Sequence, residues 1–253
     1  MKLSIVVLTC NQKGFTLKLL DTLLPILNDD RGTELIIVDN GSTDGTRQAV
    51  EEFPGLPKQT LKYHYNSQNR GVAAGRNIGL KKAQGEIILI LDNDTEVTKE
   101  AVDNLLNHLD HNPACGLCAP ALYSPEGALQ ESAKPFPGLA IKLRHLLKKG
   151  ESSASELDAM ASGHPYYVIG ACQMFRRGII EKIGLLDEKI FYGPEDADWC
   201  ERIRKAGYTI DYLPEISIIH HWQRATNRSP FSRLSLLHAK GLLHFYITRK
   251  RLF

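Results

Sequence analysis

The chain has 253 residues, of which 43% are hydrophobic and 24% charged, so its composition is that of a globular protein and excludes wholesale disorder. The longest aliphatic run, Ile87–Leu91, is far shorter than the roughly 20 residues that a membrane span needs. The net charge of +2 is unevenly distributed, because residues from 216 onward include seven bases and no acid, whereas residues 1–215 carry 24 bases and 29 acids. We therefore expect the two parts to meet different partners.

Short aliphatic runs alternate with helical patterns through the first hundred residues. We predict helices at 15–27, 46–53 and 71–83, between strands at 3–9, 34–40, 61–66 and 86–94. This alternation predicts an α/β fold with a mainly parallel central sheet flanked by helices. In such sheets ligands bind beyond the carboxyl ends of the strands.

The second half of the chain is less regular. Residues 123–166 contain Pro, Gly and Ser and predict a long insertion. We predict a strand at 166–177, a helix at 193–208 that starts with acids and ends with bases, and a strand at 216–219. The basic tail, 230–253, predicts a C-terminal helical extension. This extension either lies on an anionic membrane or packs on the domain.

Five cysteines stand at positions 10, 115, 118, 172 and 200. The odd number, and the apolar segments around three of them, favour reduced thiols in a cytosolic protein. Cys115-Gly-Leu-Cys118 has the spacing of metal ligands, but the sequence offers no second Cys or His pair at a suitable distance.

An acidic pair, Asp92 and Asp94, follows a buried strand. Side chains two residues apart on an extended chain point to the same side, so both carboxylates can approach one Mg²⁺ or Mn²⁺ ion. The alternative is that one of them only caps the next helix, near Thr98. Neither the G-x-G-x-x-G fingerprint nor a P-loop pattern is present, which argues against ordinary dehydrogenases and P-loop NTPases.

The combined motifs resemble the family 2 glycosyltransferases, which have the GT-A (Rossmann-like) fold, and especially their bacterial rhamnosyltransferase-like branch. The resemblance covers roughly residues 3–222. Six segments carry it, in order: IVVLTCNQ (5–12), IIVDNGSTDGT (36–46), NRGVAAGRNIGL (69–80), LDND (91–94), GACQMFRR (170–177) and GPEDADWCERIRKAGY (193–208).

The resemblance implies a metal-dependent, inverting glycosyltransferase using Mn²⁺ or Mg²⁺. It would move a sugar from a UDP- or dTDP-linked donor, dTDP-rhamnose included, to a hydroxyl of a glycan or lipid-linked saccharide in cell-surface polysaccharide synthesis. We expect a cytoplasmic protein without a nucleic-acid partner, held at the inner face of the cell membrane if its tail binds lipid. The expected domain spans 1–225, with a nucleotide-binding half at 1–95, an acceptor-binding half at 96–225 and the extension at 226–253.

The implied contacts to the nucleotide sugar are Thr9, Asn11, Asp39, Asn69, Arg70, Arg76, Asp92 and Asn93. The Asp39 carboxylate would accept a hydrogen bond from the ring N–H of uracil or thymine, because charged acceptors bind such donors strongly. The alternative is a turn-forming role in DNGSTDG (39–45). Arg70 and Arg76 would face the diphosphate, or else point to solvent beside a tightly packed helix.

On the acceptor side, the resemblance implies that Asp196 is the general base, which removes the proton of the attacking hydroxyl. It implies that Glu195 and Trp199 bind the acceptor, although Trp199 is also a natural packing residue. Asp94 and His220 would hold the metal ion, and the alternative for His220 is a half-buried structural histidine.

Two other classes of protein stay open at this stage. A sugar-phosphate nucleotidyltransferase also combines an α/β sheet with acidic metal ligands, but the glycine-rich basic loop of those enzymes is missing after the first strand. A non-catalytic sugar-nucleotide-binding protein is the other class, and the intact acids at 39, 92, 94 and 196 weigh against it.

Overall fold

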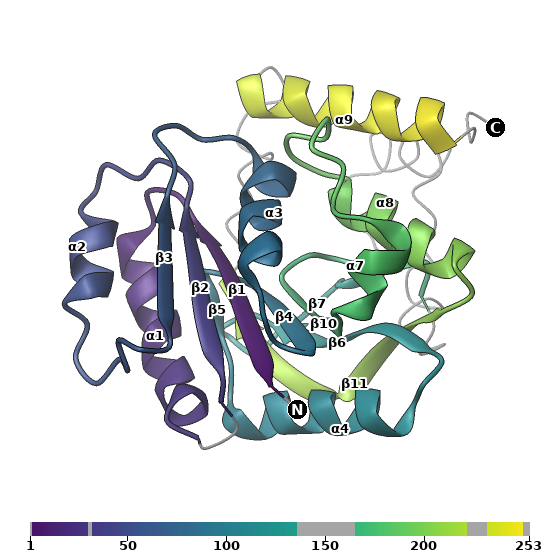
Figure 1. The fold of residues 1–253 in the computed structure, drawn as a ribbon. Helices are drawn as coiled ribbons and strands as arrows, with labels where there is room; N and C mark the ends of the chain where they lie inside the picture. Colours follow the sequence, from purple (N-terminus) through teal and green to yellow (C-terminus); the bar gives the residue numbers. More distant parts are fainter. Residues whose placement is uncertain (1, 30–31, 136–164, 222–231, 250–253) are drawn as a thin grey trace.

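The computed structural model describes residues 2–29, 32–135, 165–221 and 232–249 (Figure 1). Most of the predicted insertion, the expected domain boundary at 225 and the last four residues of the basic tail lie outside these ranges. Among the described residues, no helix has both the length and the apolar character needed to cross a bilayer.

The first half of the chain forms the predicted parallel sheet. Its strands stand in the order β3-β2-β1-β4, with parallel pairing throughout. The aliphatic side chains of β1, β2 and β4 are buried, as is usual for parallel strands covered on both faces, whereas the edge strand β3 is only part-buried. The strands are β1 (Leu3–Thr9), β2 (Glu34–Asp39), β3 (Leu61–Tyr65) and β4 (Ile87–Asp92), and the helices between them are α1 (Lys13–Leu27), α2 (Thr46–Glu51) and α3 (Val72–Lys82).

The second half of the sheet is mixed rather than parallel. β10 (Cys172–Arg176) lies antiparallel between β4 and β6 (Cys115–Tyr123), and β11 (Thr209–His220) then pairs parallel with β6. The predicted strand at 166–177 is two strands, β9 (Tyr167–Val168) and β10, and the one at 216–219 is only the end of β11. Short strands complete the described part: β5 (Thr95–Glu96) and β7 (Leu129–Gln130) at the sheet edges, and β8 (Ala133–Lys134), which pairs with β9.

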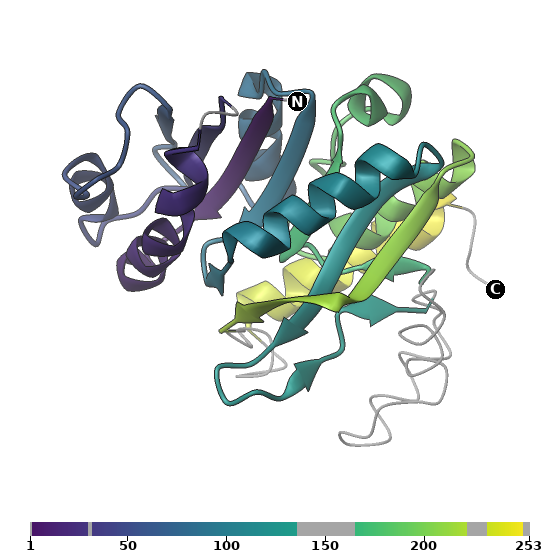
Figure 2. The same cartoon turned by 90° about the horizontal axis from the view of Figure 1, so that it is seen from below.

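Helices cover both faces of the sheet and enclose two apolar cores (Figures 1 and 2). One core lies under α1, α2 and α4 (Lys99–His111), and the other under α3, α7 (Gly178–Ile183) and α8 (Glu195–Lys205). The C-terminal helix α9 (Arg233–Arg249) packs on α8 through the buried rings of Phe245 and Tyr246. Packing on the domain, one of the two expectations for the tail, is therefore observed for this helix.

Small residues allow α3 to lie very close to the sheet. A Cβ atom placed on Gly75 would stand only 2.5 Å from Cδ1 of Leu8 on β1. This close approach positions Arg76, the next residue, so that its side chain reaches beneath the carboxyl ends of β1 and β4.

Candidate active site

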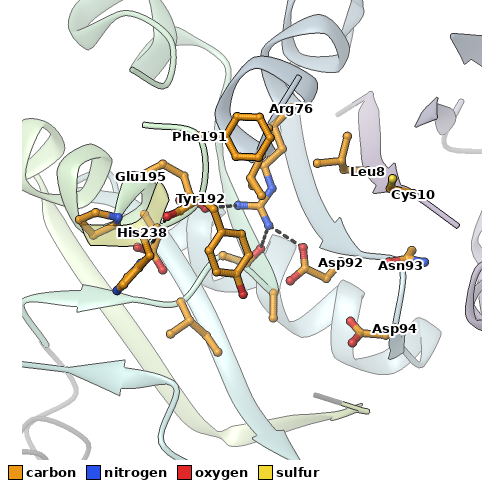
Figure 3. Close-up of a pocket in the computed structure, with 18 of the residues that line it drawn as sticks. Leu8, Cys10, Arg76, Asp92, Asn93, Asp94, Phe191, Tyr192, Glu195 and His238 are labelled. Carbon is orange, nitrogen blue, oxygen red and sulfur yellow. Dashed lines mark hydrogen bonds and ion pairs between the residues drawn. The ribbon is translucent and has the colours of Figure 1, made fainter. Parts of the chain in front are cut away.

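A cavity of about 580 Å³ opens at the carboxyl ends of β1, β4 and β11, within the size range of small-molecule sites (Figure 3). The start of α8 and one side of α9 close it from the other direction. Nine of the predicted site residues line it, namely Thr9, Asn69, Arg76, Asp92, Asn93, Asp94, Glu195, Asp196 and His220.

Arg76 links the two sides of this cavity. Its guanidinium donates to Oδ1 of Asp92 at 2.5 Å and lies 3.4 Å from Oε1 of Glu195, as the dashed lines in Figure 3 mark. A third contact reaches the carbonyl oxygen of Gly170 at 2.8 Å. Arg76 is only 3% exposed, so this arginine is a buried cross-link between β4 and α8, and not the solvent-facing side chain that we considered.

Asp92, Asp94 and His220 form a candidate cation site. One ligand atom from each of the three side chains lies within 4.8 Å of the others. The position of Asp94 is held by its own carbonyl oxygen, which accepts from the backbone N–H of His221, and by the pairing of β5 with β11. Two carboxylates and an imidazole are a donor set that suits Mn²⁺.

The hydrogen bonds of Gln130 orient His220 for this role. The Gln130 side-chain amide donates to the carbonyl oxygen of His220 at 2.7 Å, so its Oε1 atom is left to accept from Nδ1 of the same imidazole, also at 2.7 Å. The neutral ring then carries its proton on Nδ1 and presents the lone pair of Nε2 to Asp94, 3.5 Å away. His221 turns elsewhere, toward Glu96.

Glu195 and Asp196 begin α8 and face the same cavity. Asp196 is partly exposed there, whereas Glu195 is 6% exposed. Burial, followed by the charge of Asp196, raises the pKa of Glu195 to about 7, and the charge of Arg76 opposes this rise. A carboxyl group that titrates near neutrality beside a second carboxyl is typical of acid–base sites.

Glu195 should make the folding stability depend on pH. Its pKa is raised from 4.5 to about 7, so between these values the native state binds more protons than the unfolded chain. Stability from this group is therefore present below pH 4.5 and is lost as the pH rises to about 7, at up to about 1.4 kcal/mol per pH unit. Urea unfolding at pH 5, 6 and 7 measures the effect, and Glu195→Gln should remove this decrease in the free energy of unfolding. If the free energy of unfolding of Glu195→Gln fell with pH as steeply as that of the native protein, the assignment to Glu195 would be wrong.

Three residues that were predicted to bind the nucleotide sugar do not line the cavity, and two of them bond to other parts of the protein instead. Asp39 is fully buried, and its two carboxylate oxygens accept from the Ser42 backbone N–H at 2.7 Å and the Tyr63 hydroxyl at 2.5 Å. The structure thus places Asp39 off the cavity lining, in the turn contact that was its alternative role. Asn11 accepts from the Thr43 backbone N–H, and neither it nor the exposed Arg70 lines the cavity.

Thr9 and Asn93 belong to a buried hydrogen-bond group beneath the cavity. The Asn93 amide donates to the hydroxyl of Thr9 at 3.3 Å and to that of Thr16 at 3.1 Å, and the two hydroxyls lie 2.8 Å apart. These bonds tie the end of β4 to β1 and α1, so they hold Asp92 and Asp94 in place.

The predicted acceptor contact of Trp199 is wrong for this geometry. Its side chain is fully buried, meets Phe175 edge-to-face at 4.7 Å between ring centroids, and donates to the Gly184 carbonyl oxygen. Three positions after Asp196, it faces the core beneath α8 and does not line the cavity. Trp199 therefore has the alternative role, that of a packing residue.

Several residues that line the cavity were not predicted from the sequence. Asn40, inside the DNGSTDG turn, holds the backbone of Arg70 and Gly71 through its side-chain oxygen and amide. Phe191 and Tyr192 directly precede the GPED segment (193–196), and this position next to the predicted acids could have indicated that they line the site. Other lining residues that were not predicted are Gln130, Lys134 and Tyr167, in or beside the predicted insertion, and Leu234 and His238 on α9.

The chain matches known proteins over most of its length. The model of the family described as glycosyl transferase family 2 matches residues 4–184. An N-acetylglucosaminyl-diphospho-decaprenol L-rhamnosyltransferase of Mycobacterium tuberculosis is 27% identical over 227 residues, which are 84% of this chain and 74% of the relative. The dTDP-rhamnosyl transferase RfbF of Shigella flexneri is 22% identical, over 81% of this chain and 64% of the relative.

Solved structures share the fold. The mannosyltransferase PcManGT from Pyrobaculum calidifontis, in complex with GDP-Man and Mn²⁺, superposes with a TM-score of 0.69 at 19% identity. That match covers 98% of this chain but 64% of the mannosyltransferase, so the chain spans less than two thirds of its length. The expected GT-A fold is confirmed by this likeness. The family match over residues 4–184 shows that the chain belongs to glycosyl transferase family 2.

Proposed function

We propose that this protein is an inverting glycosyltransferase that moves a sugar from a UDP- or dTDP-linked donor to a hydroxyl of a glycan or lipid-linked saccharide. The observation that carries the proposal is that one cavity joins the Asp92–Asp94–His220 cluster to the acids at the start of α8. A nucleotide sugar needs a cationic partner for its diphosphate and a base for the incoming hydroxyl. Both can be supplied here across a single space.

In the proposed reaction, Asp196 accepts the proton of the acceptor hydroxyl as its oxygen bonds to the anomeric carbon. The bond between that carbon and the diphosphate oxygen breaks on the opposite face, and the nucleoside diphosphate leaves with the electron pair. Glu195, held by Arg76, orients the acceptor beside Asp196. No covalent bond to the protein is needed.

We propose that Asp94 and His220, with Asp92 beside them, hold a divalent cation. The orientation of His220 by Gln130 supports this, since it directs a ring nitrogen lone pair into the cluster. Such a cation would neutralise the growing charge on the leaving diphosphate. Manganese fits the imidazole ligand better than magnesium does.

The relatives favour a particular donor and acceptor. Two of them are described as rhamnosyltransferases, one acting on N-acetylglucosaminyl-diphospho-decaprenol and one described as a dTDP-rhamnosyl transferase. By analogy we propose dTDP-rhamnose as the first donor to test and a lipid-linked saccharide of cell-surface polysaccharide synthesis as the acceptor.

A donor screen tests the proposed reaction. UDP-, dTDP- and GDP-sugars are incubated with the protein and with Mn²⁺ or Mg²⁺, and the released product is identified. Release of a nucleoside diphosphate that depends on acceptor supports the proposal. Release of inorganic diphosphate from a nucleoside triphosphate and a sugar phosphate would indicate a nucleotidyltransferase, and binding without any turnover would indicate a non-catalytic protein.

We also propose that the protein is cytoplasmic and works at the inner face of the cell membrane, with α9 as the contact. Leu236, Leu243 and Ile247 recur at helical spacing and are 64%, 55% and 57% exposed. Lys240 is exposed within the same row. An exposed apolar row that includes a basic residue is the pattern of a helix that lies on anionic lipid. Other residues of α9 line the cavity, which would place a lipid-linked acceptor nearby.

Vesicle flotation tests this contact. The protein should float with vesicles that contain anionic lipid and lose much of this binding at high salt. A variant with Leu236, Leu243 and Ile247 all replaced by Gln should stay unbound. Tyr65→Gln, which removes another exposed apolar side chain, is the control and should bind normally. Equal flotation of the triple variant and the native protein would overturn the proposed membrane contact.

A further inference from the structure

A second cluster of metal-ligand side chains lies far from the cavity. His108 on α4, Cys115 on β6 and Asp211 on β11 each bring one ligand atom within 4.8 Å of the others. Asp211 pairs with Cys118 and Ile219, next to His220, pairs with Tyr123, so five steps along β6 at about 3.3 Å each place Asp211 and His220 roughly 20 Å apart. Figure 2 shows α4 lying across the long strands β6 and β11. The cluster is therefore separate from the proposed catalytic site.

A bulge in β6 turns Cys118 toward the same face of the sheet as Cys115. Cys115 pairs with Thr209, but Leu117 pairs with Ile210, so Gly116 is an extra residue in the ladder. Residues three apart on a regular strand face opposite sides, and one extra residue places them on the same side. Both cysteines accordingly face the α4 side of the sheet. The hydrogen bond with Cys118, followed by burial, raises the pKa of the Cys115 thiol.

A thiol sulfur, an imidazole and a carboxylate are donors that a zinc site takes, whereas hard cations such as Mg²⁺ avoid sulfur. The thiols of Cys115 and Cys118 are buried, and so is Asp211. His108 is part-exposed, which gives a cation a route from solvent. We propose that His108, Cys115 and Asp211 form a structural site for Zn²⁺ or a similar soft divalent cation.

Such a site would fasten the end of α4 to the first residues of β6 and β11. The Nε2 atom of His108 and a carboxylate oxygen of Asp211 are now 2.8 Å apart. Two ligand atoms of a tetrahedral zinc ion stand about 3.3 Å apart. The two side chains would therefore have to move apart by only some tenths of an ångström to admit the cation. Binding would also release the thiol proton to solvent, so affinity should rise with pH.

Titration with Co²⁺ under a phosphine reductant tests the site, because cobalt bound by thiolates gives a near-ultraviolet charge-transfer band. The native protein should develop this band up to one equivalent, and Zn²⁺ should abolish it. Cys115→Ser and His108→Ala should lack the tetrahedral cobalt spectrum. Cys200→Ser should keep it, as should a variant with Asp94 and His220 both replaced by Ala, which lacks the cavity cluster.

The thermal midpoint gives a second measurement on the same proteins. Zn²⁺ should raise the midpoint of the native protein and of Cys200→Ser, but not that of His108→Ala, which changes only a part-exposed side chain. No thiolate band in the reduced native protein would overturn the proposal. So would a band that persists in Cys115→Ser, or a Cys115–Cys118 disulfide that resists the reductant and leaves no metal bound.

Discussion

Replacing Asp196 by Asn is expected to lower the turnover number for sugar transfer by about 10²- to 10⁴-fold, the usual contribution of a positioned proton acceptor. An amide of the same shape cannot take the hydroxyl proton. Donor affinity should remain unchanged, because Asp196 lies at the start of α8, across the cavity from the Asp92–Asp94–His220 cluster. The measurement pairs nucleoside diphosphate release with calorimetric titration of the donor.

Glu195→Gln is the matched comparison for that experiment. It should keep more turnover than Asp196→Asn and should shift the pH dependence of kcat/KM, since a carboxyl group that titrates near pH 7 is gone. If Glu195→Gln abolished transfer while Asp196→Asn retained near-normal turnover, the base would be Glu195. Weaker donor binding in Asp196→Asn would instead place this residue on the donor side.

Replacing Arg76 by Met is expected to destabilise the protein by about 3–5 kcal/mol, as is usual when one partner of a buried charge pair is removed. The loss leaves Glu195 buried beside Asp196 without a compensating cation, and it leaves the Gly170 carbonyl oxygen without its donor. Chemical denaturation of Arg76→Met against the native protein measures the effect. Arg47→Met removes an exposed arginine that pairs with Glu51 and should leave the midpoint nearly unchanged.

A double-mutant cycle identifies the cause of that loss. Adding Glu195→Gln to Arg76→Met should recover part of the lost stability, because the uncompensated buried charge is then removed. Additive losses in the double variant would show that Arg76 acts mainly through packing, contrary to our interpretation.

The parallel half of the fold could be predicted from the sequence because three of its strands, β1, β2 and β4, contain uninterrupted aliphatic runs. Ile87–Leu91, for example, is short, aliphatic and set between two predicted helices, which favours a strand covered on both faces. The mixed half gave no such signal. β6 contains Gly116 and Pro120, and its burial depends on pairing with β10 and β11, which are distant in the chain.

The candidate site was predictable where a motif places side chains at a strand end, as with Asp92 and Asp94. It was not predictable where the outcome depends on packing. The helical phase of α8 decides that Asp196 faces the cavity and Trp199 the core. The hydrogen bond from Tyr63 to Asp39 forms only because β2 pairs with β3.

The shared guanidinium of Arg76 makes the two halves of the cavity electrically interdependent. A cation bound at Asp92 competes with Arg76 for that carboxylate. The positive charge of Arg76 is then less neutralised by Asp92 and acts more strongly on Glu195. A stronger field favours the ionised form of Glu195, so filling the donor side lowers the proton affinity of the acceptor side. By reciprocity, ionising Glu195 must strengthen the attraction for positive charge on the donor side.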